Sequence, residues 1–339
     1  MKNTIKNRYE MIMLVQAKNC NPRGDTDAGN EPTIDPSSGK AIITDVAIKR
    51  DIRDYIQDAY PEQEILISNG RSINKAIAEA VLSVNKIDEF DKNFTNKKVP
   101  ETSNWLAEKY YDVRAFGGVL STGRNGGQVR GAAQVAIAES FDAVNQNTLT
   151  ITRMAYTDGK DFGNMDDYIK EESARPENKK RTMGNKGFIS YGLFPIKVTV
   201  SAALAEKVGF TECDLKILQE AVLQCINHEV SSSKMGYDVV SPLIIFKHVG
   251  TQDAANAEEK AREAKLGCAS AYKLFSLLKV SKKEGVEFPQ EYTDYSVSLD
   301  WKNIPDGVEV WVKKAPFCPA VAGDEAIKAL ISENINVTR

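Results

Sequence analysis

The order in which strand-like and helix-like apolar patterns follow one another limits this chain to a few folds. Apolar runs and alternation predict strands, whereas apolar residues three and four apart predict amphipathic helices. Six segments follow in the order strand, helix, strand, strand, helix, strand: residues 8–18, 44–59, 134–141, 188–203, 211–226 and 239–249. This βαββαβ order is that of a ferredoxin-like or RNA-recognition-motif core, so we expect an α+β fold with large insertions.

Further elements are expected outside that core. A second amphipathic helix is predicted over residues 72–84, and residues 88–104 have the composition of an irregular insertion. Residues 295–301 and 308–312 are expected to form a late strand pair, because a turn sequence, Asn303-Ile-Pro-Asp-Gly307, joins them.

The composition excludes several classes of protein. The chain has 339 residues with 44 Lys and Arg against 47 Asp and Glu, a formal net charge of −3. Bulk positive charge therefore cannot attract nucleic acid, although a local basic track remains open. Two histidines and five scattered cysteines without a CxxC pair disfavour zinc sites and disulfide frameworks. No apolar stretch approaches the roughly 20 residues that span a bilayer, and none resembles a signal peptide, so we expect a soluble cytoplasmic chain.

A glycine-rich segment over residues 114–131 is the first candidate phosphate contact. It holds six glycines and three arginines but no acid. Its core, Gly123-Arg-Asn-Gly-Gly-Gln-Val-Arg-Gly131, could present backbone N–H groups and arginines to phosphates. It is not a nucleotide P-loop, because no Gly-Lys-Ser/Thr follows and a strand comes next. A mobile glycine-rich turn is the alternative.

A second candidate lies on the first predicted helix, which Thr44 can cap. Lys49 and Arg53 are expected along the flank of its apolar face, with Arg50 one step further round. Because Asp45, Asp51 and Asp54 balance these cations, an ordinary polar helix flank explains them as well as phosphate binding does.

The third candidate is a stretch in which the sign of the charge changes. Residues 158–172 carry six acids and two lysines, whereas residues 179–186 carry Lys179, Lys180, Arg181 and Lys186 without an acid. Such a polar stretch with few apolar residues predicts a protruding hairpin or a mobile loop.

Catalytic and metal-binding motifs are not evident. Asp25 and Asp27 lie in a long loop that lacks the spacing and the downstream Glu of a calcium site, so a solvated acidic loop is expected. There is no Gly-x-Ser-x-Gly, and neither His228 nor His248 is near a plausible nucleophile in sequence. We expect no cofactor and no metal. The residues alone reach an RNA-recognition-like α+β protein with three candidate phosphate-contact segments.

Several motifs nevertheless resemble those of the backbone subunit of the CRISPR Cascade complex, most closely its subtype I-C form. The resemblance covers about residues 7–313. The motifs that carry it, in family order, are Asn19-Cys-Asn-Pro-Arg-Gly-Asp-Thr-Asp-Ala-Gly-Asn30, Thr33-Ile-Asp-Pro36, Ile43-Thr-Asp-Val-Ala-Ile-Lys-Arg50, Asp112-Val-Arg-Ala-Phe-Gly-Gly-Val-Leu-Ser-Thr122, Gly127-Gln-Val-Arg-Gly131, Tyr191-Gly-Leu193 and Ser296–Val310.

The resemblance implies a hand-shaped molecule. The implied divisions are an RNA-recognition-like palm (7–59, 112–150 and 187–313), inserted helical fingers (60–111), a thumb hairpin (151–186) and a C-terminal tail (314–339). Several copies would stack along a guide RNA, each covering on the order of six nucleotides. The guide bases would stay free to pair with target DNA.

The resemblance also implies partners and contacts. The partners would be the crRNA, target DNA through the guide heteroduplex, further copies of the chain, and the five-prime-end capping or processing subunit and large subunit of Cascade. The implied RNA-binding residues are Asn21, Arg23, Lys49, Arg50, Arg53, Arg114, Gly117, Gly118, Ser121, Thr122, Arg124, Gln128, Arg130, Lys179, Lys180, Arg181, Met183 and Lys186. Met183 would be the wedge at a displaced nucleotide.

Two rival functions remain open on the sequence. One is a metal-dependent RNA endonuclease like the related type III backbone subunit, with Asp25, Asp27 or Asp45 as the acidic residue. The other is a small-molecule α+β enzyme without a nucleic-acid role. The resemblance favours a non-catalytic scaffold over both.

Overall fold

Two long antiparallel strands form the centre of the structure, a computed structural model that describes residues 3–92, 94–157 and 160–338. β1 (Tyr9–Cys20) pairs with the second half of β10 (Thr182–Val200). They lie in an eight-stranded sheet whose main order is β16 (Val321–Ala322), β15 (Val308–Lys313), β12 (Leu243–His248), β1, β10 and β7 (Ala133–Val135), with β11 (Tyr237–Val239) on β1 and β9 (Gln146–Arg153) on β10.

Both faces of this sheet are covered. Met11, Met13 and Val15 of β1 contribute to the core with α1 (Asp45–Ala59) and α7 (Glu212–His228), whereas Ile12 and Leu14 contribute to a core on the opposite face. The second core is completed by α9 (Ala271–Phe275), α10 (Gly323–Ser332), and the strands β13 (Leu278–Lys282), β14 (Tyr295–Asp300) and β17 (Ile335–Thr338). Burial on both sides explains why β1 is a nearly continuous apolar run.

The two core helices begin where the sequence predicts. The Thr44 side chain accepts a hydrogen bond from the Ala47 N–H at the start of α1. Thr211 and Asp214 form a reciprocal capping box at the start of α7, which satisfies two N–H groups that a helix leaves unpaired. These local signals are confirmed.

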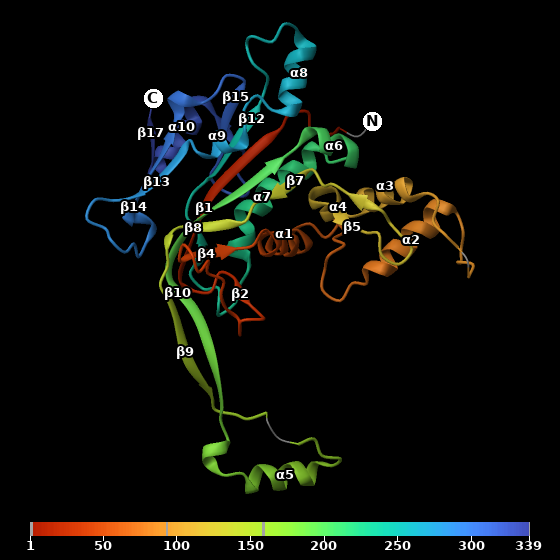
Figure 1. Ribbon diagram of the computed structural model, residues 1–339, viewed down its shortest axis with the longest axis vertical. Helices are drawn as coiled ribbons and strands as arrows, with labels where there is room; N and C mark the ends of the chain where they lie inside the picture. The colour runs from red at the N-terminus through yellow and green to blue at the C-terminus, as the bar shows by residue number, and fades with distance from the viewer. Residues whose placement is uncertain (1–2, 93, 158–159, 339) are drawn as a thin grey trace.

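Residues 60–116 add a separate helical region on one side of the body (Figure 1). It contains α2 (Ile73–Asn85), α3 (Val99–Lys109) and the short α4 (Tyr111–Phe116), and α2 packs on α3 around Ile77, Val81 and Leu106. The expectation of an irregular stretch over residues 88–104 is wrong from Val99 onward. Pro100 stands in the first turn of α3, a position where proline favours a helix start.

Two strand predictions also need correction. The single strand expected over residues 134–141 is two short strands, β7 and β8 (Ala138–Ala143). The late strands do not pair with each other: β14 lies between β13 and β17, while β15 lies between β12 and β16. The turn sequence between β14 and β15 therefore connects two different sheets.

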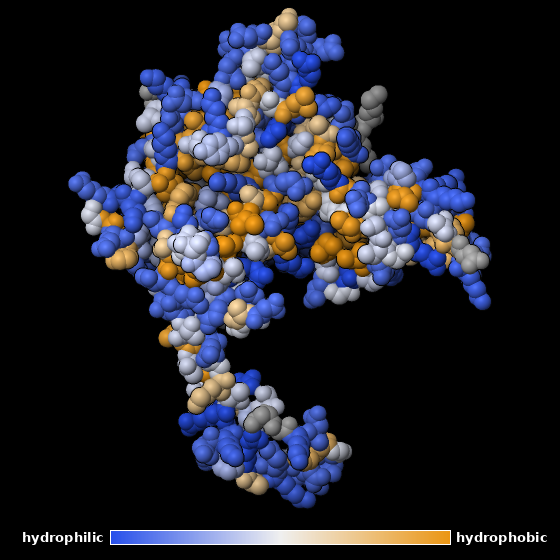
Figure 2. Space-filling view, in the orientation of Figure 1, coloured by the Kyte–Doolittle hydropathy of each residue, from blue (hydrophilic) through white to orange (hydrophobic). Residues whose placement is uncertain are grey.

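A narrow arm leaves the body where β10 outruns the sheet (Figure 1). Residues 182–189 of β10 pair with β9, and residues 189–200 pair with β1. The far end of the arm carries α5 (Met165–Ala174), in which no residue is buried. In the space-filling view the arm stands clear of the body (Figure 2).

The remaining elements are short. They are β2 (Gly24–Asp25), β3 (Glu31–Pro32), β4 (Lys40–Ile43), β5 (Gly118–Val119), β6 (Gln128–Val129), α6 (Ala202–Val208), α8 (Ala257–Leu266) and the 3-10 turns Glu177–Lys179, Tyr292–Asp294 and Trp301–Asn303. Among the helices of the described residues, none has the length and apolar character needed to cross a membrane.

The C-terminal helix α10 packs into the second core, and substitutions at two neighbouring residues test this packing. Leu330 of α10 is fully buried, whereas Ile331 is 58% exposed. Leu330→Ala should lower the free energy of unfolding by about 2–5 kcal/mol, because it leaves a cavity in the second core. Ile331→Ala should change that free energy by about 0.5 kcal/mol or less. Urea unfolding measures both, and equal effects would contradict the packing of α10.

Candidate nucleic-acid interface

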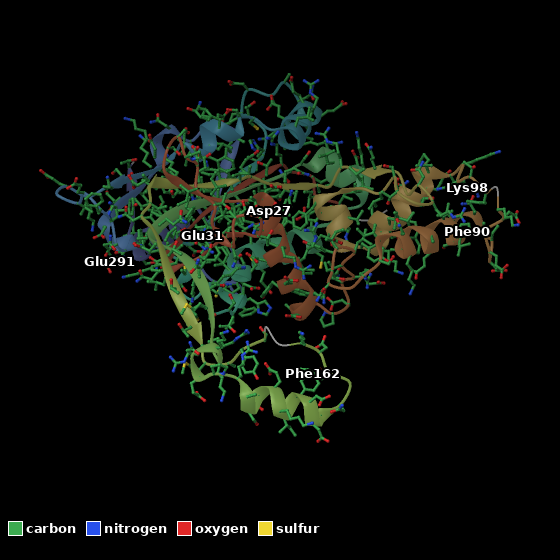
Figure 3. The ribbon with its side chains drawn as sticks, turned by 60° about the horizontal axis from the view of Figure 1, so that its bottom comes forward. Asp27, Glu31, Phe90, Lys98, Phe162 and Glu291 are labelled. Atoms are coloured by element: carbon green, nitrogen blue, oxygen red, sulfur yellow. The ribbon has the colours of Figure 1, made fainter. Side chains whose placement is uncertain are left out.

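The arm is exposed along most of its length. All eight residues of β9 are exposed, and so are Met154 (70%) and Met183 (75%). Its contacts with the body lie at its root, where Gln146 Nε2 and Thr148 Oγ1 donate hydrogen bonds to the Glu31 carboxylate at 2.7 and 3.1 Å. Figure 3 shows Glu31 beside this root and Phe162 at the far end. The expectation of a protruding hairpin is therefore met in shape.

The cations of the arm differ in whether they already have a hydrogen-bond or ion-pair partner within the chain. Lys180 Nζ pairs with Glu177 at 2.7 Å, and Lys186 Nζ donates to the Ser232 carbonyl oxygen at 3.0 Å. Lys179 and Arg181 are exposed, and neither side chain has a hydrogen bond or ion pair within the described residues. These two charges are available to an external anion.

The three cations of α1 are paired with acids of the same chain, and one of them is more buried than the sequence predicts. Lys49 pairs with Asp45 at 2.9 Å, and Arg50 binds Asp54 through two nitrogens while keeping 41% of its side chain exposed. Arg53, expected on the flank of the helix, is buried instead. Its Nε donates to Asp112 Oδ2 at 2.8 Å, and its guanidinium lies 5.1 Å from the centre of the Phe116 ring.

Asp112 explains why Arg53 is buried. Its carboxylate also accepts the backbone N–H groups of Leu66 and Ile67 at 2.7 and 3.0 Å. The pair therefore ties α1 to the chain that leads into α2. Arg53 is thus buried within the body and paired with Asp112.

The glycine-rich segment also contains both buried residues that pack against the body and exposed residues. Arg114 is mostly buried and donates from Nε and Nη2 to Asp214 Oδ1 at 3.0 and 2.8 Å. A Cβ on Gly117 would collide with the Val129 carbonyl oxygen, and Gly117 has φ +77°, so the backbone there requires glycine. Gly131 likewise leaves no room for a side chain. These residues serve the packing of the segment.

The outer part of this segment faces solvent. Ser121, Gln128 and Arg130 are exposed, and the Arg130 guanidinium has no hydrogen bond or ion pair in the part of the chain that the structure describes. Thr122 Oγ1 bonds to Asn74, and the Arg124 guanidinium stacks 4.2 Å from the centre of the Phe90 ring. Gly118 is half-buried in β5. Arg130 is thus the most exposed of the three arginines in the segment.

The first long loop contributes little free charge. Asn21 is buried, and its Nδ2 donates to the Asn30 carbonyl oxygen at 2.8 Å. Arg23 bonds to the neighbouring Gly24 carbonyl oxygen. Both residues shape the loop, and Arg23 remains partly exposed.

The acidic residues of the rival endonuclease function do not converge. Asp25 Oδ1 accepts the Asp27 N–H at 3.0 Å, Asp45 pairs with Lys49, and Asp27 is exposed. Across the described residues, no three His, Cys, Asp or Glu side chains lie close enough to hold one metal ion.

Sequence reasoning missed one segment of this surface. The turn over residues 229–236 reaches the arm root through Ser232, and its Lys234 pairs with Asp51 of α1 at 3.0 Å. Burial raises the pKa of Asp51, and the Lys234 ammonium opposes that rise. Three consecutive serines before Lys234 were the only sequence signal.

The chain matches a known protein family over most of its length. The sequence pattern of the family described as CRISPR-associated protein Cas7 matches residues 7–300. The chain belongs to the Cas7 family. It is 25% identical over 241 residues to the CRISPR-associated protein Cas7 of Haloferax volcanii, and this match covers 69% of each chain.

Solved structures similar to this Cas7-family chain were also found. A chain of a "CRISPR RNA-guided surveillance complex, pre-nicking" aligns with a TM-score of 0.43 and 16% identity, covering 79% of this chain and 85% of that chain. A chain of a "CRISPR RNA-guided surveillance complex" aligns with a TM-score of 0.35 and 15% identity, covering 79% of each.

The different roles of Arg53 and Arg50 can be separated by stability. Asp112→Ala should lower the free energy of unfolding by about 3–5 kcal/mol, because it leaves the buried Arg53 guanidinium unpaired. Arg50→Ala removes the exposed pair with Asp54 and should cost less than about 1 kcal/mol. Urea unfolding followed by circular dichroism compares them. A small loss for Asp112→Ala would show that the pair does not hold α1 to the helical region.

Proposed function

We propose that this chain is the guide-RNA-binding backbone subunit of a CRISPR RNA-guided surveillance complex of subtype I-C, with a structural and not a catalytic role. Membership of the Cas7 family supports the general assignment. The observation that carries the proposal is the arm, whose strands and α5 have surfaces that their own chain leaves uncovered. Such an arm is built to contact another molecule, and we assign it to the guide RNA and a neighbouring copy.

The central strands support an RNA-recognition-like palm. Four strands lie antiparallel in the spatial order β12, β1, β10, β7, and α1 and α7 cover one face. In sequence order these elements run β1, α1, β7, β10, α7, β12, the βαββαβ pattern of the ferredoxin-like fold. We assign the region of α2 and α3 to the fingers and the arm to the thumb.

Local charges can hold RNA on a chain of negative net charge. Arg130 in the glycine-rich segment and Lys179 and Arg181 on the arm are exposed and unpaired among the described residues. Phosphate contacts by such cations are independent of base sequence, which leaves the guide bases free for pairing. Met183, 75% exposed, remains our candidate for the wedge at a displaced nucleotide. The other partners that we propose are target DNA through the heteroduplex and the remaining Cascade subunits.

A matched pair of double variants tests the RNA contacts. Arg130→Glu with Arg181→Glu should weaken binding of single-stranded RNA by about a hundredfold at low salt. The slope of log K against log salt should fall by about 1.4, because each single-strand phosphate contact contributes about 0.7. Lys302→Glu with Lys328→Glu changes the net charge equally at exposed positions elsewhere and should leave affinity nearly unchanged. Equal losses in both variants would contradict a localised track.

A cleavage assay tests the structural role. Complementary RNA incubated with the assembled complex and magnesium should remain intact, because the proposed role is to hold the guide RNA and not to cleave its complement. Cuts at regular spacing that disappear in Asp27→Asn would establish the endonuclease function instead. Purified chain that carries no nucleic acid and binds none would favour a small-molecule enzyme.

A further inference from the structure

The turn over residues 229–236, which joins α7 to β11, lies where three parts of the candidate interface meet. The Asn21 N–H donates to the Ser233 carbonyl oxygen at 2.7 Å, which joins the turn to the first long loop. Lys186 Nζ donates to the Ser232 carbonyl oxygen at 3.0 Å, which joins the turn to the root of the arm. The turn therefore bridges segments that are far apart in the sequence.

The inner side of the turn is held firmly. Lys234 Nζ pairs with Asp51 Oδ1 at 3.0 Å and with Glu229 Oε1 at 3.7 Å. The Lys18 N–H donates to the Gly236 carbonyl oxygen at 2.8 Å, and Gly236 has φ +96°, with no room for a Cβ against the Lys18 carbonyl oxygen. These contacts fix where the outer side of the turn points.

The outer side combines apolar and polar groups that the fold itself does not use. Val230 is 82% exposed and Met235 is 67% exposed, although a tight turn between a helix and a strand needs neither side chain. Ser232 is exposed between them. Residues 230–236 contain no acid, and the Lys186 ammonium lies against the Ser232 backbone. The half-buried Lys186 ammonium has three N–H donors and spends one of them on the Ser232 carbonyl oxygen. A cation, a hydroxyl and a flexible apolar side chain together match a sugar–phosphate better than they match a protein surface.

We propose that this turn is a binding site for the ribose–phosphate backbone of single-stranded RNA at the root of the arm. The Ser232 hydroxyl and the Lys186 ammonium hold one phosphate, and Met235 packs against the adjoining ribose or base. The inference rests on the proposed function and adds a further RNA-contacting surface at the root of the arm.

Affinity measurements with matched controls test the site. Ser232→Asp places a negative charge beside the phosphate and should weaken binding of a fluorescein-labelled single-stranded RNA by about tenfold or more. Met235→Ala should weaken it by about threefold, a loss of packing only. Ser276→Asp directly after α9 makes the same serine-to-aspartate change at an exposed position elsewhere. Leu266→Ala at the end of α8 removes an exposed apolar side chain of similar size to Met235, and both controls should leave the affinity unchanged. Fluorescence anisotropy at fixed salt gives the dissociation constants, and thermal unfolding checks that each variant is folded.

A crosslink separates this inference from the proposed function. A photoreactive amino acid at position 235 should crosslink to the RNA, whereas the same amino acid at position 266 should not. If wild type binds RNA while Ser232→Asp and Met235→Ala bind equally well and position 235 gives no RNA crosslink, the turn is not part of the track although the proposed function stands. A crosslink from 235 to another protein chain would overturn the inference in favour of a protein contact. Absence of RNA binding by wild type would overturn both.

Discussion

The ladder of hydrogen bonds between β1 and β10 is the interaction on which the rest of the structure depends. It runs from Tyr9 opposite Val200 to Cys20 opposite Ile189, through the most deeply buried part of the sheet. The same strand β10 then continues outward and pairs with β9. Because one strand belongs to both the core and the arm, the packing of the sheet sets the direction of the arm. The arm is thus a rigid extension at its root and not a loosely tethered loop.

The buried arginines of this molecule are paired with acids, whereas several exposed cations among the described residues are not. Arg53 and Arg114 are paired with Asp112 and Asp214 inside the body, where they join the inserted helices to the core. Arg130, Lys179 and Arg181 remain exposed. A formal charge of −3 is therefore compatible with a basic track. The buried arginines are neutralised by the acids beside them, whereas the exposed cations are left to attract an anion.

The sequence predicts well those features that depend on neighbouring residues. The caps at Thr44 and Thr211 are local hydrogen bonds, and their side chains are sufficient to identify them. The order of the core elements was also predictable, because each element keeps its own apolar period. The protruding shape of the arm followed from its polar composition.

Features that depend on distant partners were not predictable. The pairing of β14 with β17 depends on the C-terminal segment, for which the sequence offered no assignment. Arg53 shares its helical spacing with an ordinary surface cation, and only the arrival of Asp112 from 59 residues away buries it. The turn over residues 229–236 had no apolar period at all, and its place at the arm root is a tertiary contact.

We propose that copies of this chain assemble along a guide RNA by contacts that repeat with the nucleotide count. Native mass spectrometry of the chain expressed with CRISPR arrays of different spacer lengths tests it most directly. We expect the number of bound copies to rise by one for each increment on the order of six nucleotides. A fixed number of copies at every guide length, or a chain that purifies without RNA, would contradict it.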